Sequence, residues 1–151
     1  PCVVRKDYKW TWLYAAVEPM TAEQFCLYLP NLDGDGFEVF LEELAQDYPD
    51  DLIILFTDNA PAHIKAAIDI PKNIILLHFP PYSPELNPLE RWFQDFRKDL
   101  ANKLFDSIEH IHLALNDSLE PFRYDKERLE LLTNFPWWWF GIKQLDLLAH
   151  S

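Results

Sequence analysis

Two acidic residues, Asp58 and Glu90, occupy positions from which they could act together on one substrate. Asp58 directly follows the apolar run Asp51–Thr57, and Glu90 falls on the first turn of a predicted helix. Two carboxylates held close together repel each other, and a bound divalent cation removes that conflict because hard cations prefer oxygen ligands. The pair therefore predicts a site for Mg²⁺ (or Mn²⁺). Such ions can stabilise the attacking and the leaving oxygen when a phosphodiester is cleaved.

The elements before Asp58 are predicted from the spacing of apolar residues. Lys9–Val17 is rich in β-forming residues, and larger apolar residues recur at every second position of Glu23–Leu29. Two such strands joined by a short turn favour an antiparallel hairpin. A helix of about a dozen residues should follow and end near Tyr48-Pro49, because proline cannot continue it. The run Asp51–Thr57 has the composition of a strand buried on both faces.

The elements after Asp58 should bring Glu90 towards it. Ile74–Phe79 is predicted to be a second buried strand, and a proline-rich hinge separates it from a helix that runs from Asn87 to about Phe105. Further helices are expected around Ile108–Leu119 and Lys126–Leu132. Ligands of open α/β sheets bind beyond the carboxyl ends of the strands, where Asp58 lies. The order of elements predicts a mixed α/β sheet flanked by helices.

Each of these residues also has an ordinary structural interpretation. Glu90 and Asn87 have the spacing of a capping box, in which the glutamate only caps its own helix. Asp58 and Asn59 could form a simple strand-to-helix turn. A single histidine such as His63 is more often structural than a ligand. The sequence leaves these alternatives open.

Composition limits the class of protein. A chain of 151 residues with 49% hydrophobic content suits one domain, residues 1–151. Cys2 and Cys26 lack metal-ligand spacing and are expected to be free thiols, and the apolar runs are too short for a membrane span, which favours a cytoplasmic protein. The net charge of −12 argues against DNA binding through a broad basic surface.

Two motifs together resemble one family. The segments 58–63, Asp-Asn-Ala-Pro-Ala-His, and 80–91, which ends in Asn-Pro-Leu-Glu-Arg, closely resemble the DDE transposases of the mariner superfamily, with the bacterial insertion-sequence branch nearest. The resemblance implies a ribonuclease H-like fold, two Mg²⁺ (or Mn²⁺) ions, and cutting and joining of transposon-end DNA. It implies that Asp58 and Glu90 are catalytic acids and metal ligands, supported by Asn59 and His63.

The same resemblance predicts that one part of the domain is missing. The family's first catalytic aspartate lies on the first, central strand, upstream of the strand that begins here near Trp10. The residues before Trp10 offer only Asp7, in a polar turn-like stretch, and Asp33 and Asp35 are expected to be solvated turn residues. We therefore expect a truncated catalytic domain, weakly active or inactive alone, whose gap is filled by Pro1–Lys6 or by a second copy.

Partners follow from the remaining features. Arg91, Arg97 and Lys98 could contact DNA phosphate, or could simply form a solvated helix face. The block 137–140, Trp-Trp-Trp-Phe, could stack on unpaired bases or pack in the core and a dimer. Expected partners are transposon ends and either a second copy or a full-length transposase. The alternative functions are a self-sufficient metal-dependent nuclease and a non-catalytic interaction module or transposase relic.

Overall fold

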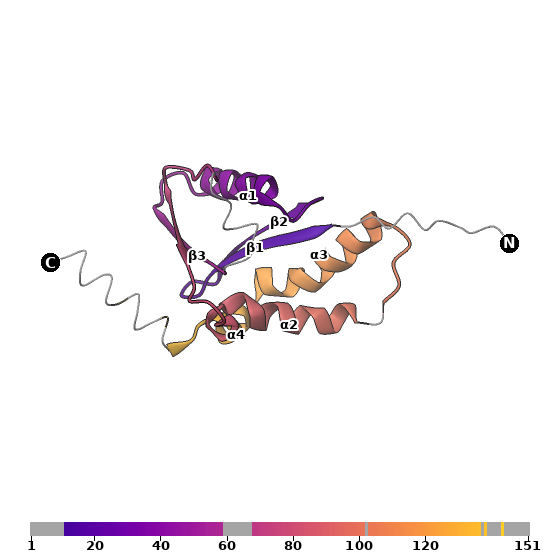
Figure 1. Ribbon diagram of the computed structural model, residues 1–151. Coiled ribbons are helices and arrows are strands. Elements are labelled where there is room, and N and C mark those ends of the chain that lie inside the picture. The colour runs from indigo at the N-terminus through magenta and orange to yellow at the C-terminus, as the bar shows by residue number, and fades with distance from the viewer. Residues whose placement is uncertain (1–10, 59–67, 102, 137, 139–142, 144–151) are drawn as a thin grey trace.

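The computed structural model describes residues 11–58, 68–101, 103–136, 138 and 143 (Figure 1). In chain order these residues form β1 (Trp12–Glu18), β2 (Glu23–Leu29), α1 (Gly34–Asp47), β3 (Ile53–Thr57), β4 (Ile74–His78), the 3₁₀ turn η2 (Pro84–Leu86), α2 (Pro88–Leu100), α3 (Ile108–Tyr124) and α4 (Lys126–Thr133). The expectation of an α/β protein with helices packed on strands is confirmed.

The predicted hairpin is confirmed. β1 and β2 pair antiparallel over their whole length, from Trp12 opposite Leu29 to Glu18 opposite Glu23. The turn is closed by the Glu18 carboxylate, which accepts the Thr21 backbone N–H at 2.7 Å. Because successive side chains of a strand point to opposite faces, this register divides the hairpin into two apolar faces.

Different helices cover the two faces of the hairpin, as Figure 1 shows. On one face, Tyr14 and Leu27 lie in a core with α1 that also contains Phe40. On the other face, Leu13 and Cys26 lie in a second core with α2, α3 and α4. The helices of this second core contribute the fully buried side chains Trp92, Leu119, Phe122 and Leu129. The hairpin is therefore the middle of three layers.

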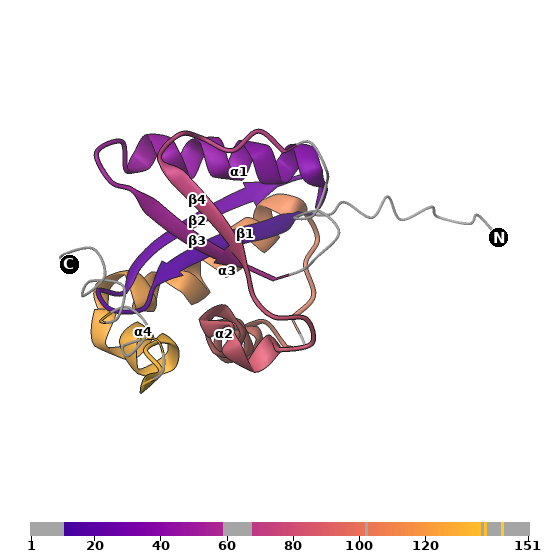
Figure 2. The same cartoon turned by 60° about the vertical axis from the view of Figure 1, so that its left-hand side comes forward.

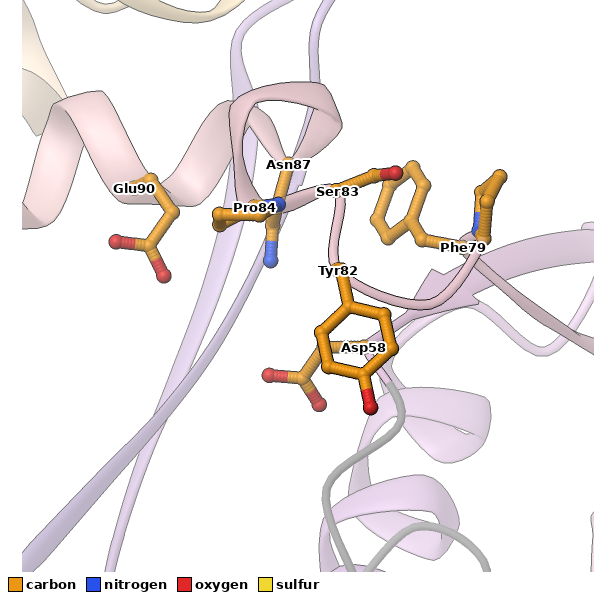
Figure 3. A pocket seen from close by; sticks show the side chains of 8 residues that line it. Asp58, Phe79, Tyr82, Ser83, Pro84, Asn87 and Glu90 are labelled. Atoms are coloured by element: carbon orange, nitrogen blue, oxygen red, sulfur yellow. The ribbon is translucent and has the colours of Figure 1, made fainter.

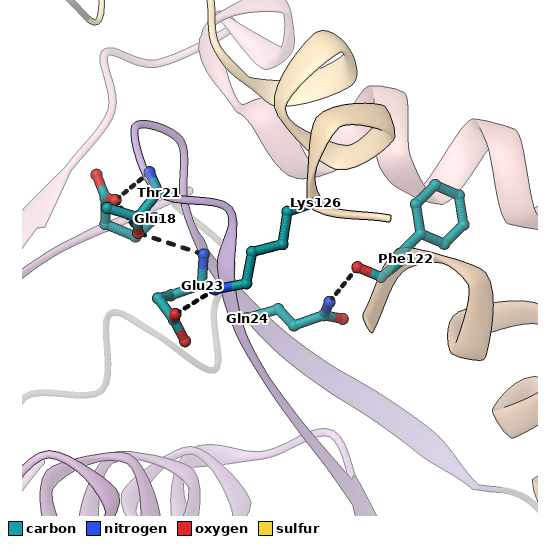
Figure 4. A network of polar contacts seen from close by, with 6 residues as sticks. All are labelled: Glu18, Thr21, Glu23, Gln24, Phe122 and Lys126. Carbon is teal, nitrogen blue, oxygen red and sulfur yellow. Dashed lines mark hydrogen bonds and ion pairs between the residues drawn. The ribbon is translucent and has the colours of Figure 1, made fainter. Parts of the chain in front are cut away.

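Polar contacts hold the hairpin against the last two helices (Figure 4). The Gln24 side-chain amide donates to the backbone carbonyl of Phe122 at 2.8 Å, and the Lys126 ammonium contacts the Glu23 carboxylate at 2.6 Å. Both ends of the ion pair are about half exposed, so we expect it to add little stability by itself. The amide contact fixes where α3 ends relative to β2.

β3 and β4 form a separate parallel pair, from Ile53 opposite Ile74 to Thr57 opposite His78. Their inner face packs on α1, but Ile54 on the outer face remains 44% exposed. Ile75 and Leu77 on β4 are similarly exposed, so the prediction that these strands are buried on both faces is wrong. The reason is that the apolar stripes of α2, α3 and α4 pack on the hairpin instead.

In the described part of the chain, the four strands form two two-stranded sheets, and neither pair is joined to the other (Figure 2). This arrangement is compatible with a ribonuclease H-like fold whose sheet is truncated. The segment expected to fill the gap, Pro1–Lys6, lies outside the described residues.

Several boundaries differ from the predictions. α2 ends at Leu100 rather than near Phe105, and α3 continues through Pro121 to Tyr124. Asp33 is exposed, as expected, but it also caps α1, because its carboxylate accepts the Gly36 backbone N–H at 2.8 Å. No described helix combines the length and the apolar character that a membrane crossing requires.

The Cys26 thiol is predicted to be unreactive in the folded protein. Burial raises its pKa from 9.0 to about 11, although the positive charge of Arg123 acts in the opposite direction. In a Cys2→Ser background at pH 8, we expect a thiol reagent to modify Cys26 at least about 100-fold more slowly in the native protein than in urea. Stopped-flow absorbance with a disulfide reagent measures both rates.

The same shift has a consequence for stability. A raised folded-state pKa means that the buried neutral thiol stabilises the fold below about pH 9 and loses this contribution as the pH rises towards 11. Cys26→Ala should therefore flatten the decline of the unfolding free energy over that range. An equally steep decline in both proteins would contradict the assignment.

Candidate catalytic site

Asp58 and Glu90 line one cavity of about 150 Å³. Figure 3 shows their carboxylates directed into the same space from different segments of the chain. The remaining lining residues come from the hinge between β4 and α2, and are Phe79, Pro80, Tyr82, Ser83, Pro84 and Asn87. The structure thus brings together the two acids that the sequence singles out.

The end of β3 positions Asp58. The parallel register places Thr57 opposite His78, and the Thr57 hydroxyl lies 3.1 Å from the His78 Nδ1 atom. The Thr57 carbonyl also accepts the Phe79 backbone N–H at 2.8 Å. These bonds fix the backbone that carries Asp58 against the start of the hinge. His78 was not singled out from the sequence, although the pairing of two adjacent strand ends would have located it.

The hinge positions Glu90 through a series of local bonds. Asn87 donates its backbone N–H to the Pro84 carbonyl at 3.0 Å, which closes η2. The Asn87 side-chain oxygen then accepts the Leu89 backbone N–H at 3.0 Å and caps α2. Proline at the first position of α2 has no N–H to leave unsatisfied there. Helix α2 therefore starts at a fixed place, with Glu90 on its first turn.

The capping-box interpretation of Glu90 is not supported. In a capping box the glutamate accepts the backbone N–H of the cap residue. Here that N–H, on Asn87, already donates to Pro84. Glu90 instead lines the cavity.

Tyr82 is an unusual residue of the cavity. Its φ is 59°, in the left-handed region that residues other than glycine rarely adopt, and its side chain is fully exposed. From the sequence, Tyr82 was noted only as one residue of the hinge motif. Neither its backbone conformation nor its exposure could be inferred from residue types alone.

The predicted phosphate-binding cations lie elsewhere. The Arg91 guanidinium lies 4.4 Å from the centre of the Phe135 ring, and Arg97 lies 5.9 Å from the Phe93 ring. Lys98 is paired with an aspartate on its own helix. Among the described residues that line the cavity there is no lysine, arginine or histidine. The contact of Arg91, Arg97 and Lys98 with DNA stays a prediction.

Other predicted residues fall in different places. Asn59 and His63 lie outside the described residues, as do most members of the aromatic block 137–140. Trp138 packs edge-on against Phe56 and Phe79, with its ring centre 5.1 and 6.1 Å from theirs, and Phe79 also lines the cavity. The observed role of Trp138 is therefore packing against these two aromatic rings, and the dimer contact stays a prediction.

The side chains at the cavity suit a hard cation only in part. Asp58 and Glu90 supply carboxylate oxygens, the ligands that Mg²⁺ and Mn²⁺ prefer. Within the described ranges, however, no three acidic, histidine or cysteine side chains gather into one possible metal site. A cation here would need further oxygen ligands, from water, a phosphate or another carboxylate.

Comparison with known proteins agrees with this geometry. The DDE superfamily endonuclease family matches residues 3–112, which include both acids and the hinge. The chain belongs to this family. A DDE superfamily endonuclease acts on DNA, and such nucleases generally use divalent metals. The chain is also 33% identical, over 104 residues, to the uncharacterized protein y4pE/y4sA of Sinorhizobium fredii, covering 68% of this chain and 77% of that protein. No solved structure matches the chain.

The cap at Asn87 gives a test of how this DDE endonuclease domain holds Glu90. Replacing Asn87 with Ala should lower the free energy of unfolding by about 1 kcal/mol, because the Leu89 N–H loses its acceptor. Asn87→Ser, which can still cap the helix, should retain most of the stability. Urea unfolding followed by circular dichroism measures both, and equal losses would contradict the capping role.

Proposed function

We propose that this chain is the catalytic part of a DNA transposase of the mariner superfamily, in its bacterial insertion-sequence branch. Asp58 and Glu90 would hold Mg²⁺ or Mn²⁺ for phosphodiester cleavage and strand transfer. The observation that carries the proposal is that these two motif acids, from separate segments, line one cavity. Asn59 and His63 would support the site.

The residues of the cavity have distinct tasks in this proposal. The bonds at Thr57 and Asn87 hold the two carboxylates in place before substrate arrives. When bound, divalent cations would activate the attacking oxygen and stabilise the leaving oxygen of the phosphodiester. The proline-rich hinge restricts the backbone that brings Glu90 to the cavity, and a cation bound there would take oxygen ligands from both acids.

The site requires a third acid, supplied by a strand that we place between β1 and β3. In the described residues, β1 pairs only with β2, and β3 pairs only with β4. Unpaired backbone groups at the edge of each pair would suit another strand. We propose that this strand, together with a DNA-binding region upstream, belongs to the complete transposase, and that the present chain is weakly active or inactive alone.

The partners of the proposed transposase are the ends of its transposon and a second copy of the chain or a full-length transposase. Action on chromosomal DNA would place it in the cytoplasm of a bacterial cell. Arg91, Arg97 and Lys98 lie on α2 and would contact DNA outside the cavity.

A second candidate function is a non-catalytic interaction module that binds full-length transposase. The absence of a three-residue metal cluster from the described part of the chain favours it. In that case the chain should co-purify with full-length transposase, and it should show no affinity for Mn²⁺.

Metal binding tests the assignment of the two acids. We expect the chain to bind Mn²⁺, and Asp58→Asn or Glu90→Gln to weaken that binding by about tenfold or more, since each removes a charged ligand. Asp51→Asn and Glu85→Gln are matched controls, because these exposed acids precede β3 and α2 without lining the cavity. Electron paramagnetic resonance of free Mn²⁺ measures the affinity. Equal binding by all five proteins would overturn the assignment.

Nicking of supercoiled plasmid in Mn²⁺ tests whether the two acids suffice. We expect little or no cleavage by the chain alone, because a third acid is needed. Strong cleavage that disappears in both Asp58→Asn and Glu90→Gln would instead identify a self-sufficient metal-dependent nuclease. Cleavage unchanged in those variants would show that the activity comes from elsewhere.

A further inference from the structure

Tyr82 combines two unfavourable features at the edge of the acidic cavity. A left-handed backbone costs a residue with a Cβ atom roughly 1–2 kcal/mol, and φ is 59° here. A fully exposed aromatic ring gains nothing from burial that could offset this cost. Strain of this kind persists where the surrounding structure imposes it, and it often marks a functional site.

The residues on either side of Tyr82 restrict its backbone. Pro80, Pro81 and Pro84 restrict the backbone on both sides, and the Ser83 hydroxyl donates to the Pro81 carbonyl at 3.3 Å. Tyr82 lines the same cavity as Asp58 and Glu90, and Figure 3 shows how these side chains come from different segments of the chain. The ring is therefore presented to whatever enters the cavity.

The charges around the cavity limit what could hold a nucleic acid there. The chain carries a net charge of −12, and the described lining of the cavity contains two carboxylates and no cation. Arg91 and Arg97, which follow the hinge on α2, lie over aromatic rings. The described lining therefore offers a phosphate no positively charged side chain, which is the usual source of attraction for DNA. Stacking of a base on an aromatic ring does not depend on charge and contributes about 1–3 kcal/mol per base.

We propose that Tyr82 stacks on an unpaired nucleobase next to the phosphodiester that reaches Asp58 and Glu90. The ligand class is therefore a DNA end with unpaired nucleotides rather than an intact duplex. The inference deepens the proposed function and rests on it for the identity of the substrate. Stacking on Tyr82 would hold a base of the DNA end while the neighbouring phosphate approaches Asp58 and Glu90.

The test uses fluorescence of 2-aminopurine, a base analogue whose emission falls when it stacks. A duplex with a short unpaired end carrying the analogue is titrated with the whole chain in Ca²⁺. We expect quenching by the wild type and by Tyr82→Phe, which keeps the ring. Tyr82→Ala should abolish the quenching and weaken binding by about 5- to 100-fold. Tyr124→Ala, which removes another exposed tyrosine, should behave as the wild type.

The outcomes separate this inference from the proposed function. No quenching by the wild type, equal quenching by Tyr82→Ala, or equal quenching of an analogue placed inside an intact duplex would each overturn the inference. Quenching that depends on Tyr82, in a chain whose Mn²⁺ binding does not depend on Asp58 and Glu90, would support base stacking and overturn the metal assignment. Because the Tyr82 side chain is fully exposed, Tyr82→Ala should melt at the wild-type temperature, which is checked first.

Discussion

The structure depends on one constraint, which is that a two-stranded hairpin has two apolar faces and both must be covered. Strict alternation along β1 and β2 places Tyr14 and Leu27 against α1 and places Leu13 and Cys26 against the later helices. Neither core could form without the hairpin between them. The helix α2, which carries Glu90, packs on one face of the hairpin. The strand β3, which directly precedes Asp58, packs in the core on the other face. The hairpin thus sets the relative position of the two acids.

Within that frame, local bonds at the strand end and in the hinge determine the site. The Thr57–His78 contact fixes one acid and the Asn87 cap fixes the other. Beside these acids, the left-handed backbone of Tyr82 carries a conformational cost. That cost falls at the cavity, which is where a functional site is expected to depart from what stability alone would favour.

The chain belongs to a family that acts on DNA although its net charge is −12, and the positions of its basic residues bear on how it could do so. The described basic residues of α2 are engaged with aromatic rings or a neighbouring aspartate rather than gathered at the cavity. Recognition at this point would then rely on metal ions and on ring stacking, both of which tolerate or require the carboxylates. Broad electrostatic attraction would have to come from another part of the complete protein.

The sequence by itself determined the hairpin and the order of the described strands and helices, and it singled out the two acids, because each depends on local periodicity or on a compact motif. β2 was predicted with its observed bounds, and Asp58 and Glu90 were identified from residue types and spacing. The tertiary structure decided the rest. It exposed Ile54 on a strand predicted to be buried, since the helices pack on the hairpin instead. It also removed the capping role of Glu90 and placed Tyr82 at the cavity, because both depend on how the hinge folds in space.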